Sequence, residues 1–351
     1  MKKTPFKEII EVFSKIPITS LFLFLAGSFG VVLLFYMSLV YWRVNWYSTP
    51  DFSFSYLIRT FIIALSVLAI IYSLRTGHLK KKFEFTQTQK IAVHAMISLT
   101  GISFFLCTVF PETARILGEE DNLVEWVSFG ALFLGLAMIL IIFLRGLISL
   151  KNNPLIYLSL LLFAFLLFIM GMEEISWGQR IFGLQTPENF NGNSQNELNL
   201  HNFVTTEADT LYYIGICILL IILPYLKLCF PIVFLKDFFR ILVPGPYMII
   251  IGVLPFAFHY NKWNLLFTQI WFFSALVITL ILAFSQKRLI TGRYFLLTSF
   301  LICIIQLTFL VGDDPSSVLV SGRVAEYKEL LSQAALLVYS SNVYLNLKKS
   351  R

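Results

Sequence analysis

The sequence predicts an all-α fold, a polytopic integral membrane bundle of about ten transmembrane helices with the N-terminus and the C-terminus in the cytoplasm. Composition is the first reason, because 58% of the 351 residues are hydrophobic and only 13% are charged. Soluble domains carry about a quarter charged residues. The second reason is that the apolar residues form long separate runs, and the third is that Lys and Arg gather in alternate connections. The membrane lipid bilayer is therefore the first predicted partner.

Ten apolar runs approach the length of about 20 residues that a helix needs to cross a bilayer. They fall at 17–42, 54–74, 91–110, 124–144, 154–172, 210–226, 241–259, 265–285, 294–311 and 328–346. Pro244, Pro246 and Pro255 are expected to kink or break the seventh run. The tenth run includes Glu329 and Gln333 and is amphipathic, so it is expected either to pack inside the bundle or to lie on the membrane surface.

The basic residues orient the predicted bundle. Residues 1–16, the loops after the second, fourth, sixth and eighth runs, and the C-terminus together hold 20 of the 27 Lys and Arg residues. Connections enriched in basic residues face the cytoplasm. Residues 1–16 lack a short apolar region with a cleavage site, so we expect a retained cytoplasmic tail rather than a signal peptide. The net charge of +7 is thus a topology signal, no nucleic-acid partner is predicted, and the expected location is the bacterial cytoplasmic membrane.

The acidic residues show the opposite distribution. The same topology leaves 16 of the 20 Asp and Glu residues on the outer face. Acidic residues contribute little to membrane insertion, so topology does not require this bias. Two interpretations stay open, an outward-facing site that uses carboxylates and ordinary solvated loop charge.

One compact transmembrane domain, 1–351, is the simplest organisation, because neither a soluble domain nor a repeat is visible. Within it, residues 173–209 are predicted to form an outer-face polar loop with a re-entrant or interfacial helix. The loop begins with Glu173 and Glu174, directly after the uncharged run 154–172. Ionisable groups at the end of a membrane helix need partners or a task.

Extending the fifth predicted helix beyond residue 172 places Glu173, Ser176 and Arg180 on one face. Adjacent carboxylates near a low-dielectric boundary resist joint ionisation, which suits general acid or base chemistry and makes Glu173 and Glu174 catalytic candidates. Arg180, Ser176 and Trp177 are predicted to bind substrate. The alternative is an interfacial cap in which Trp177 anchors the helix at the headgroup level.

The end of the polar loop is predicted to return to the same site. Glu197, Asn199 and His201 alternate with leucines, which directs them to one side of an extended segment. His201 is therefore a third catalytic candidate, because imidazole titrates near neutral pH, and Asn202 is a substrate-binding candidate. The alternative for His201 is a hydrogen bond that fixes the loop. The cofactor is unknown: carboxylates with imidazole also suit a divalent metal, but without HExxH or HxxxH spacing that interpretation is weakly supported.

A second acidic pair closes another apolar run. Asp313 and Asp314 follow the run 294–311, and Pro315 ends the helix. The resemblance to the Glu173–Glu174 arrangement makes both aspartates substrate-binding candidates.

The segment EEISWGQR at 173–180, together with NLHN at 199–202, resembles a signature of uncharacterised bacterial multi-pass membrane proteins. It covers about one tenth of the chain. That family has no assigned reaction, so the resemblance draws attention to this segment and implies no substrate.

Three classes of function stay open. The first is an enzyme that acts on a lipid or a lipid-linked substrate of the polyprenyl-phosphate type. Polyprenyl-phosphate-sugar transferases share this general layout, although the first outer loop here offers only Asp51 in place of their acidic pair. The second class is a ten-span transporter for a small solute or a lipid. The third is a structural or assembly subunit of a membrane complex.

Overall fold

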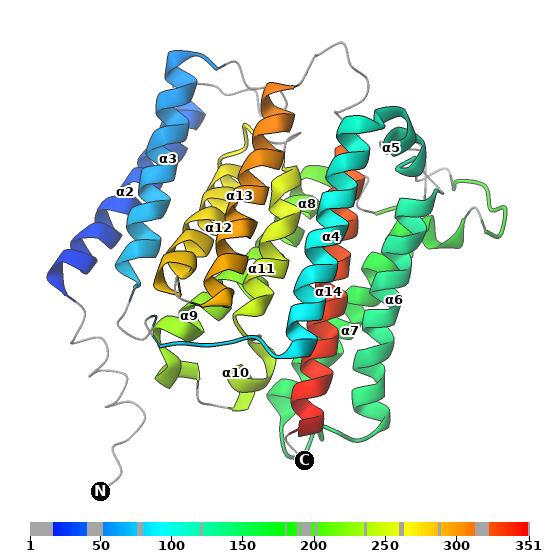
Figure 1. The fold of residues 1–351 in the computed structure, drawn as a ribbon. Helices are drawn as coiled ribbons and strands as arrows, with labels where there is room; N and C mark the ends of the chain where they lie inside the picture. The colour runs from blue at the N-terminus through cyan, green and yellow to red at the C-terminus, as the bar shows by residue number, and fades with distance from the viewer. Residues whose placement is uncertain are drawn as a thin grey trace, which may run out of the picture. The chain divides into compact units, whose positions relative to one another are not determined.

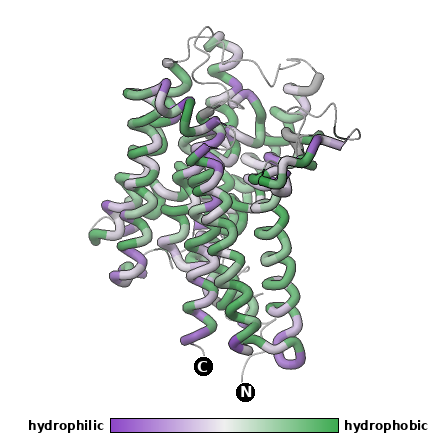
Figure 2. Tube along the Cα trace, turned by 90° about the vertical axis from the view of Figure 1, so that its right-hand side faces the viewer, coloured by the Kyte–Doolittle hydropathy of each residue, from purple (hydrophilic) through white to green (hydrophobic). Residues whose placement is uncertain are grey.

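The computed structural model describes most of the chain. The described residues are 17–40, 52–75, 79, 81–119, 122–179, 181–187, 190, 198–200, 203–234, 237–259, 263–286, 289–312 and 323–349. They are predominantly helical, with no strand among them. Eight of their helices are long and apolar enough to cross a membrane. Figure 2 shows hydrophobic residues along most of the length of these helices and hydrophilic residues mainly near their ends. The predicted class, a helical membrane bundle, is confirmed at this level.

The eight long apolar segments match eight of the predicted runs. Seven are single helices: α2 (Ile18–Val40), α3 (Phe54–Ser73), α4 (Gln87–Val109), α6 (Leu123–Leu144), α7 (Pro154–Glu174), α12 (Leu266–Ser285) and α13 (Ile290–Val311). The eighth, Ala208–Cys229, runs through α8 (Thr205–Ile216), the π-helical η5 (Cys217–Ile222) and α9 (Leu223–Cys229). A π-helical stretch is rare and is often found at functional sites.

The predicted break in the seventh run is confirmed. Helix α10 (Asp237–Leu242) ends before Pro244 and Pro246, and α11 (Tyr247–Val253) follows them. Helix α11 then tightens into the 3₁₀ segment η7 (Leu254–Phe258), which contains Pro255. The tenth run lies within α14 (Arg323–Lys349), which is long but not apolar enough to count among the eight. The count of ten spans and the cytoplasmic location of the termini therefore stay predictions.

The chain divides into two compact units, which we describe separately. Unit 1 comprises Met1–Ile97 and Cys217–Val318, and unit 2 comprises Ser98–Ile216 and Leu319–Arg351. The predicted single membrane domain is not tested by this division.

In unit 1, α2 packs on α3, α3 on α12, and α12 on α13 (Figure 1). Helix α11 contacts η5, η7, α9, α12 and α13 of this unit, and all residues from Tyr247 to Phe258 are buried. A helix too short to span, with irregular backbone at its end, is tolerated in a membrane only where protein surrounds it. Protein surrounds α11 and η7 in this way.

In unit 2, α6 packs against both α7 and α14. Helices α6 and α14 run parallel, because Ser341 Oγ donates to Met138 Sδ at 2.9 Å and Arg145 Nη1 donates to the Tyr344 hydroxyl at 2.9 Å. Tyr339 of α14 packs edge-on against Phe163 of α7, with ring centroids 5.2 Å apart. Of the two predicted placements of the tenth run, the structure therefore favours packing inside the bundle.

Candidate functional site at the acidic end of unit 2

Helix α7 ends at Glu174 and is followed by a left-handed turn. Ser176, Trp177 and Gly178 all have positive φ, at 47°, 56° and 73°. Positive φ costs a residue with a side chain roughly 1–2 kcal/mol, whereas Gly178 adopts it freely. The prediction that the helix continues to Arg180 is therefore wrong, and Glu173 and Ser176 do not share a helical face. Such strained backbone clusters at functional sites, which makes this turn a candidate.

Glu173 fixes the side chain of Trp177 across this turn. Trp177 Nε1 donates a hydrogen bond to Glu173 Oε1 at 2.6 Å, and Glu173 is only 8% exposed. The indole also packs edge-on against Phe168 of α7, with ring centroids 6.4 Å apart. These contacts hold the indole against α7 while Trp177 stays partly exposed, and its predicted roles as a substrate contact or as an interfacial anchor stay predictions. Glu173 is thus engaged in positioning the turn.

Glu174 lies in a different environment, against α14. Gln333 Nε2 donates to Glu174 Oε1 at 2.5 Å, and Gln333 is 1% exposed. The carboxylates of Glu329, Glu326 and Glu125 act electrostatically on Glu174. We call Glu125, Glu174, Glu326, Glu329 and Gln333 the acidic cluster. It joins the first turn of α6, the last turn of α7 and the first turns of α14 at one end of unit 2.

A buried lysine lies on the same stretch of α14. Lys328 is 1% exposed, and its Nζ lies 4.1 Å from the ring centroid of Tyr213 in α8. Tyr213 packs in turn against Tyr212, with ring centroids 5.0 Å apart. A desolvated ammonium over an aromatic face gains about 2 kcal/mol from the ring quadrupole. The pair ties α8 to α14 beside the acidic cluster.

The spacing of these residues in the sequence could have predicted part of this arrangement. Glu326, Glu329 and Gln333 recur at intervals of three and four, which places them on one face of a helix. Lys328 is one of only seven basic residues that the predicted topology leaves on the outer face. Their proximity to Glu174, however, depends on the packing of helices about 160 residues apart.

The side chain of Gln179 holds the polar loop against the turn. Its Nε2 donates to Thr186 Oγ1 at 2.7 Å, and its Oε1 accepts from the backbone N–H of Leu198 at 2.7 Å. The end of the loop therefore returns to the end of α7, as the sequence predicted for this segment. Asn199 is 4% exposed and Leu200 is 57% exposed, so the described part also alternates as expected.

Five predicted site residues lie outside the described residues: Arg180, His201, Asn202, Asp313 and Asp314. Their roles stay predictions. Among the described residues, no three His, Cys, Asp or Glu side chains are grouped so as to hold a metal ion. Of the predicted site residues, the structure places Glu173, Glu174, Ser176 and Trp177 together around one helix end.

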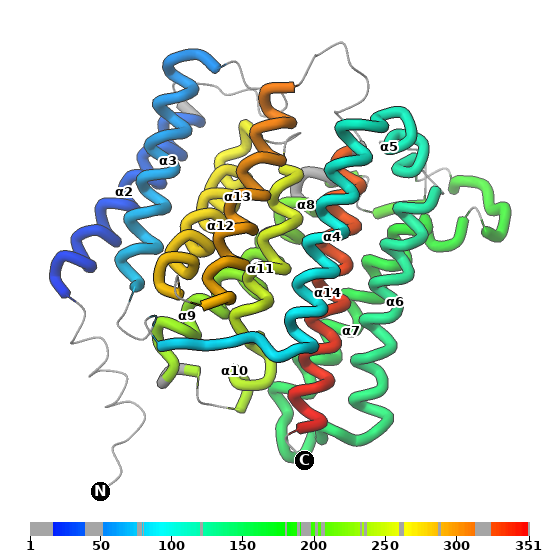
Figure 3. Tube along the Cα trace, viewed as in Figure 1, coloured from blue at the N-terminus to red at the C-terminus, as the bar shows by residue number. Residues whose placement is uncertain are grey.

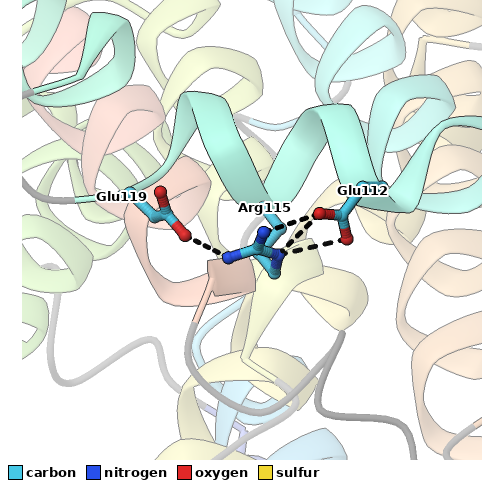
Figure 4. Close-up of polar contacts among 3 residues, drawn as sticks. All are labelled: Glu112, Arg115 and Glu119. Carbon is cyan, nitrogen blue, oxygen red and sulfur yellow. Dashed lines mark hydrogen bonds and ion pairs between the residues drawn. The ribbon is translucent and has the colours of Figure 1, made fainter.

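The short helix α5 (Pro111–Leu117) carries ion pairs between neighbours in sequence, whereas the acidic cluster is built from three helices. Arg115 donates to both Glu112 and Glu119 (Figure 4), and its bonds to Glu112 measure 2.6 and 3.1 Å. Hydrogen bonds from the half-buried Arg115 guanidinium lower the pKa of Glu112. All three residues are satisfied by neighbours on α5 or directly after it, so the interpretation as ordinary outer-face charge fits them.

Gly178→Ala is expected to destabilise the protein by about 1–2 kcal/mol, because alanine resists a φ of 73°. An additional small cost comes from the new Cβ, which would lie 3.0 Å from the Phe182 ring. Gly183→Ala is the matched control, since its φ is 62° but nothing lies within 4 Å of its Cβ. The measurement is the free energy of unfolding of both variants. If Gly178→Ala is as stable as wild type, the turn is not left-handed.

The described residues define the class of this protein as helical, and among them eight segments are long and apolar enough to cross a membrane. No protein-family model, no curated protein and no solved structure matches the chain.

Proposed function

We propose that this protein is a membrane-embedded enzyme that acts on a lipid or lipid-linked substrate, with its site at the acidic cluster. The observation that carries the proposal is the placement of Glu174, at the end of an apolar helix and among carboxylates from two other helices. Gln333 occupies one oxygen of Glu174, and Oε2 accepts no hydrogen bond from the described residues. That oxygen is available to take a proton from a substrate or a water molecule.

Exposed apolar side chains beyond the end of α7 support a lipid as the substrate. Ile181, Phe182 and Leu184 follow the left-handed turn and are 54%, 74% and 54% exposed. Phe203 and Val204, which precede α8, are 49% and 52% exposed. Large apolar residues next to polar groups at a helix end favour contact with the membrane surface. A lipid headgroup at that depth would meet Glu174.

The distribution of charge supports an outward-facing site. In unit 2, the acidic cluster lies at one end of α6 and α14, while Arg145, Lys348 and Lys349 lie at the other end. Because basic ends face the cytoplasm, the acidic end would face outward. In this proposal Glu174 is the general base, His201 its acid partner, and Arg180 holds an anionic headgroup or phosphate.

The test measures lipid turnover by the purified full-length protein in nanodiscs. Envelope lipid extracts, including polyprenyl-phosphate-linked species, are incubated with the protein and followed by mass spectrometry. Wild type is expected to consume one lipid class, and Glu174→Gln to lose at least about 100-fold in rate, the range expected for a missing general base. Glu112→Gln, an exposed carboxylate on α5, is the control and should keep full activity. Unchanged lipids with wild type, or full activity of Glu174→Gln, would refute the proposal.

A second candidate function, transport of a small solute, is favoured by one specific observation in unit 1. Helix α11 is short and buried, follows the break at Pro244 and Pro246, and packs against the π-helical η5. Discontinuous helices of this kind form the solute sites of many transporters. Loss of solute uptake in cells without the protein, together with an unchanged lipid profile, would favour this candidate over the enzyme.

A further inference from the structure

Two glutamine side chains in the core of unit 1 lack hydrogen-bond partners. Gln269 of α12 is 0% exposed and Gln306 of α13 is 1% exposed. Neither the nitrogen nor the oxygen of either amide bonds to any residue that the structure describes. Leaving a buried donor or acceptor unsatisfied costs about 1–3 kcal/mol, and most buried polar side chains in native proteins are satisfied. Four hydrogen-bonding atoms thus remain for a partner that this part of the chain does not supply.

The register of α12 and α13, which run side by side (Figure 3), gives the heights of Gln269 and Gln306 along the helix pair. Ser299 Oγ donates to Thr279 Oγ1 at 2.8 Å, which fixes the register of the neighbouring antiparallel helices α12 and α13. From this pair, Gln269 lies about 15 Å toward the start of α12, at 1.5 Å per residue. Gln306 lies about 10 Å toward the end of α13, which is the same direction. Their heights therefore differ by roughly one helical turn.

The buried segment η7 packs against both helices at this end. Phe258 contacts Phe309, three residues beyond Gln306, with ring centroids 5.5 Å apart. His259 follows η7, is 2% exposed, and lies 6.2 Å from Trp271 between ring centroids. Trp271 is two residues beyond Gln269. Aromatic rings and an imidazole therefore lie at the same end of α12 and α13 as both amides, and all of them belong to unit 1.

The scarcity of charged residues around the two amides favours an uncharged ligand. Neither α11, η7 nor α12 contains a charged residue, and the single charge of α13, Arg293, lies near its opposite end. On α3, which also packs against α12, the guanidinium carbon of buried Arg59 lies 5.2 Å from the ring centroid of Tyr56 on the same helix. A ligand ion would need a countercharge beside the amides, because isolated buried charges are costly. Carboxamides, by contrast, both donate to and accept from hydroxyl groups.

We propose that Gln269 and Gln306 bind an uncharged, hydroxyl-bearing molecule such as a sugar ring, at the end of η7 in unit 1. The two amides supply donors and acceptors to the hydroxyl groups, and Phe309, one turn beyond Gln306, and Phe258 of η7 supply the apolar surroundings typical of a small-molecule site. The proposal does not depend on the enzymatic role of the acidic cluster in unit 2. Failure of either one leaves the other standing.

The test uses the full-length protein in lipid nanodiscs, with glucose and N-acetylglucosamine as probes. Both the thermal unfolding midpoint and the tryptophan fluorescence of wild type are expected to change saturably with at least one of these sugars. Gln269→Leu and Gln306→Leu should each weaken that response at least tenfold. Without sugar, both variants should unfold no lower than wild type, because leucine removes an unsatisfied polar group. Thr308→Val on α13 is the control, since Thr308 is exposed and bonds to Ile304 of its own helix; it should respond as wild type does.

Three outcomes would overturn the proposal. If neither sugar changes the unfolding midpoint or the fluorescence of wild type, the site does not bind a sugar. Lowered stability of both leucine variants without sugar would show that the amides serve as hydrogen bonds between helices, as polar residues in membrane helices commonly do. A tenfold preference for N-acetylglucosamine 1-phosphate over N-acetylglucosamine would show that the site selects an anion, with Arg59 of α3 as a candidate countercharge.

Discussion

Glu174→Gln is expected to fold with a stability equal to or above that of wild type, whereas Glu174→Ala should lose about 1–3 kcal/mol. The glutamine keeps an oxygen that accepts the hydrogen bond from Gln333, and it removes the repulsion from Glu329, Glu326 and Glu125. Alanine leaves the buried Gln333 donor without its acceptor, and that penalty exceeds the relief of a repulsion between partly screened charges. The measurement is the free energy of unfolding of purified variants in one detergent or nanodisc preparation.

A double-mutant cycle isolates the bond between Glu174 and Gln333 from other effects of substitution. Glu174→Ala, Gln333→Ala and the double variant are expected to give a coupling energy of about 1–3 kcal/mol, the range for hydrogen bonds to a carboxylate. Ser341→Ala with Met138→Ala, a contact elsewhere between α6 and α14, is the control cycle and should give less than about 1 kcal/mol. Zero coupling between Glu174 and Gln333 would mean that the cluster does not hold α7 against α14. Glu174→Gln less stable than wild type would mean that repulsion in the cluster is negligible.

Sequence alone predicted the features that depend on local patterning. The uncharged run 154–172 predicted the apolar part of α7 (Pro154–Glu174), because a membrane helix satisfies its own backbone and keeps charges at its ends. Pro244 and Pro246 predicted the break between α10 and α11, because proline removes a backbone donor. Both inferences need only the residues within one or two turns.

The rest of the site depends on information that no local pattern carries. Extending helical spacing past Glu174 assumed negative φ, and the three positive φ values that begin at Ser176 ended the helix instead. Only Gly178 hinted at this turn. The partner of Glu174 is Gln333, and that pairing follows from how α14 packs beside α6 and α7. The same is true of Gln269 and Gln306, whose burial without partners becomes visible only in three dimensions.

Gly252→Val is expected to cause the largest loss of stability in unit 1, about 3 kcal/mol or more. Gly252 lies in the buried helix α11, directly against the π-helical η5. A Cβ at this position would lie 2.6 Å from the Leu220 Cβ, 3.3 Å from the Ile221 Cγ1 and 3.4 Å from the Leu220 carbonyl carbon. Neither helix can yield cheaply, because α11 and Leu220 are fully buried and interiors are close-packed.

The matched control lies on the same continuous span as Leu220. Gly215 of α8 has nothing within 4 Å of its Cβ, so Gly215→Ala should be neutral or stabilise the helix by up to about 1 kcal/mol. Gly252→Ala should lie between the two, because one methyl group already meets Leu220. Thermal or chemical unfolding of the three variants ranks them. If Gly252→Val is tolerated as well as Gly215→Ala, then α11 does not pack closely on η5. The π-helical stretch would in that case have no role in seating the buried helix.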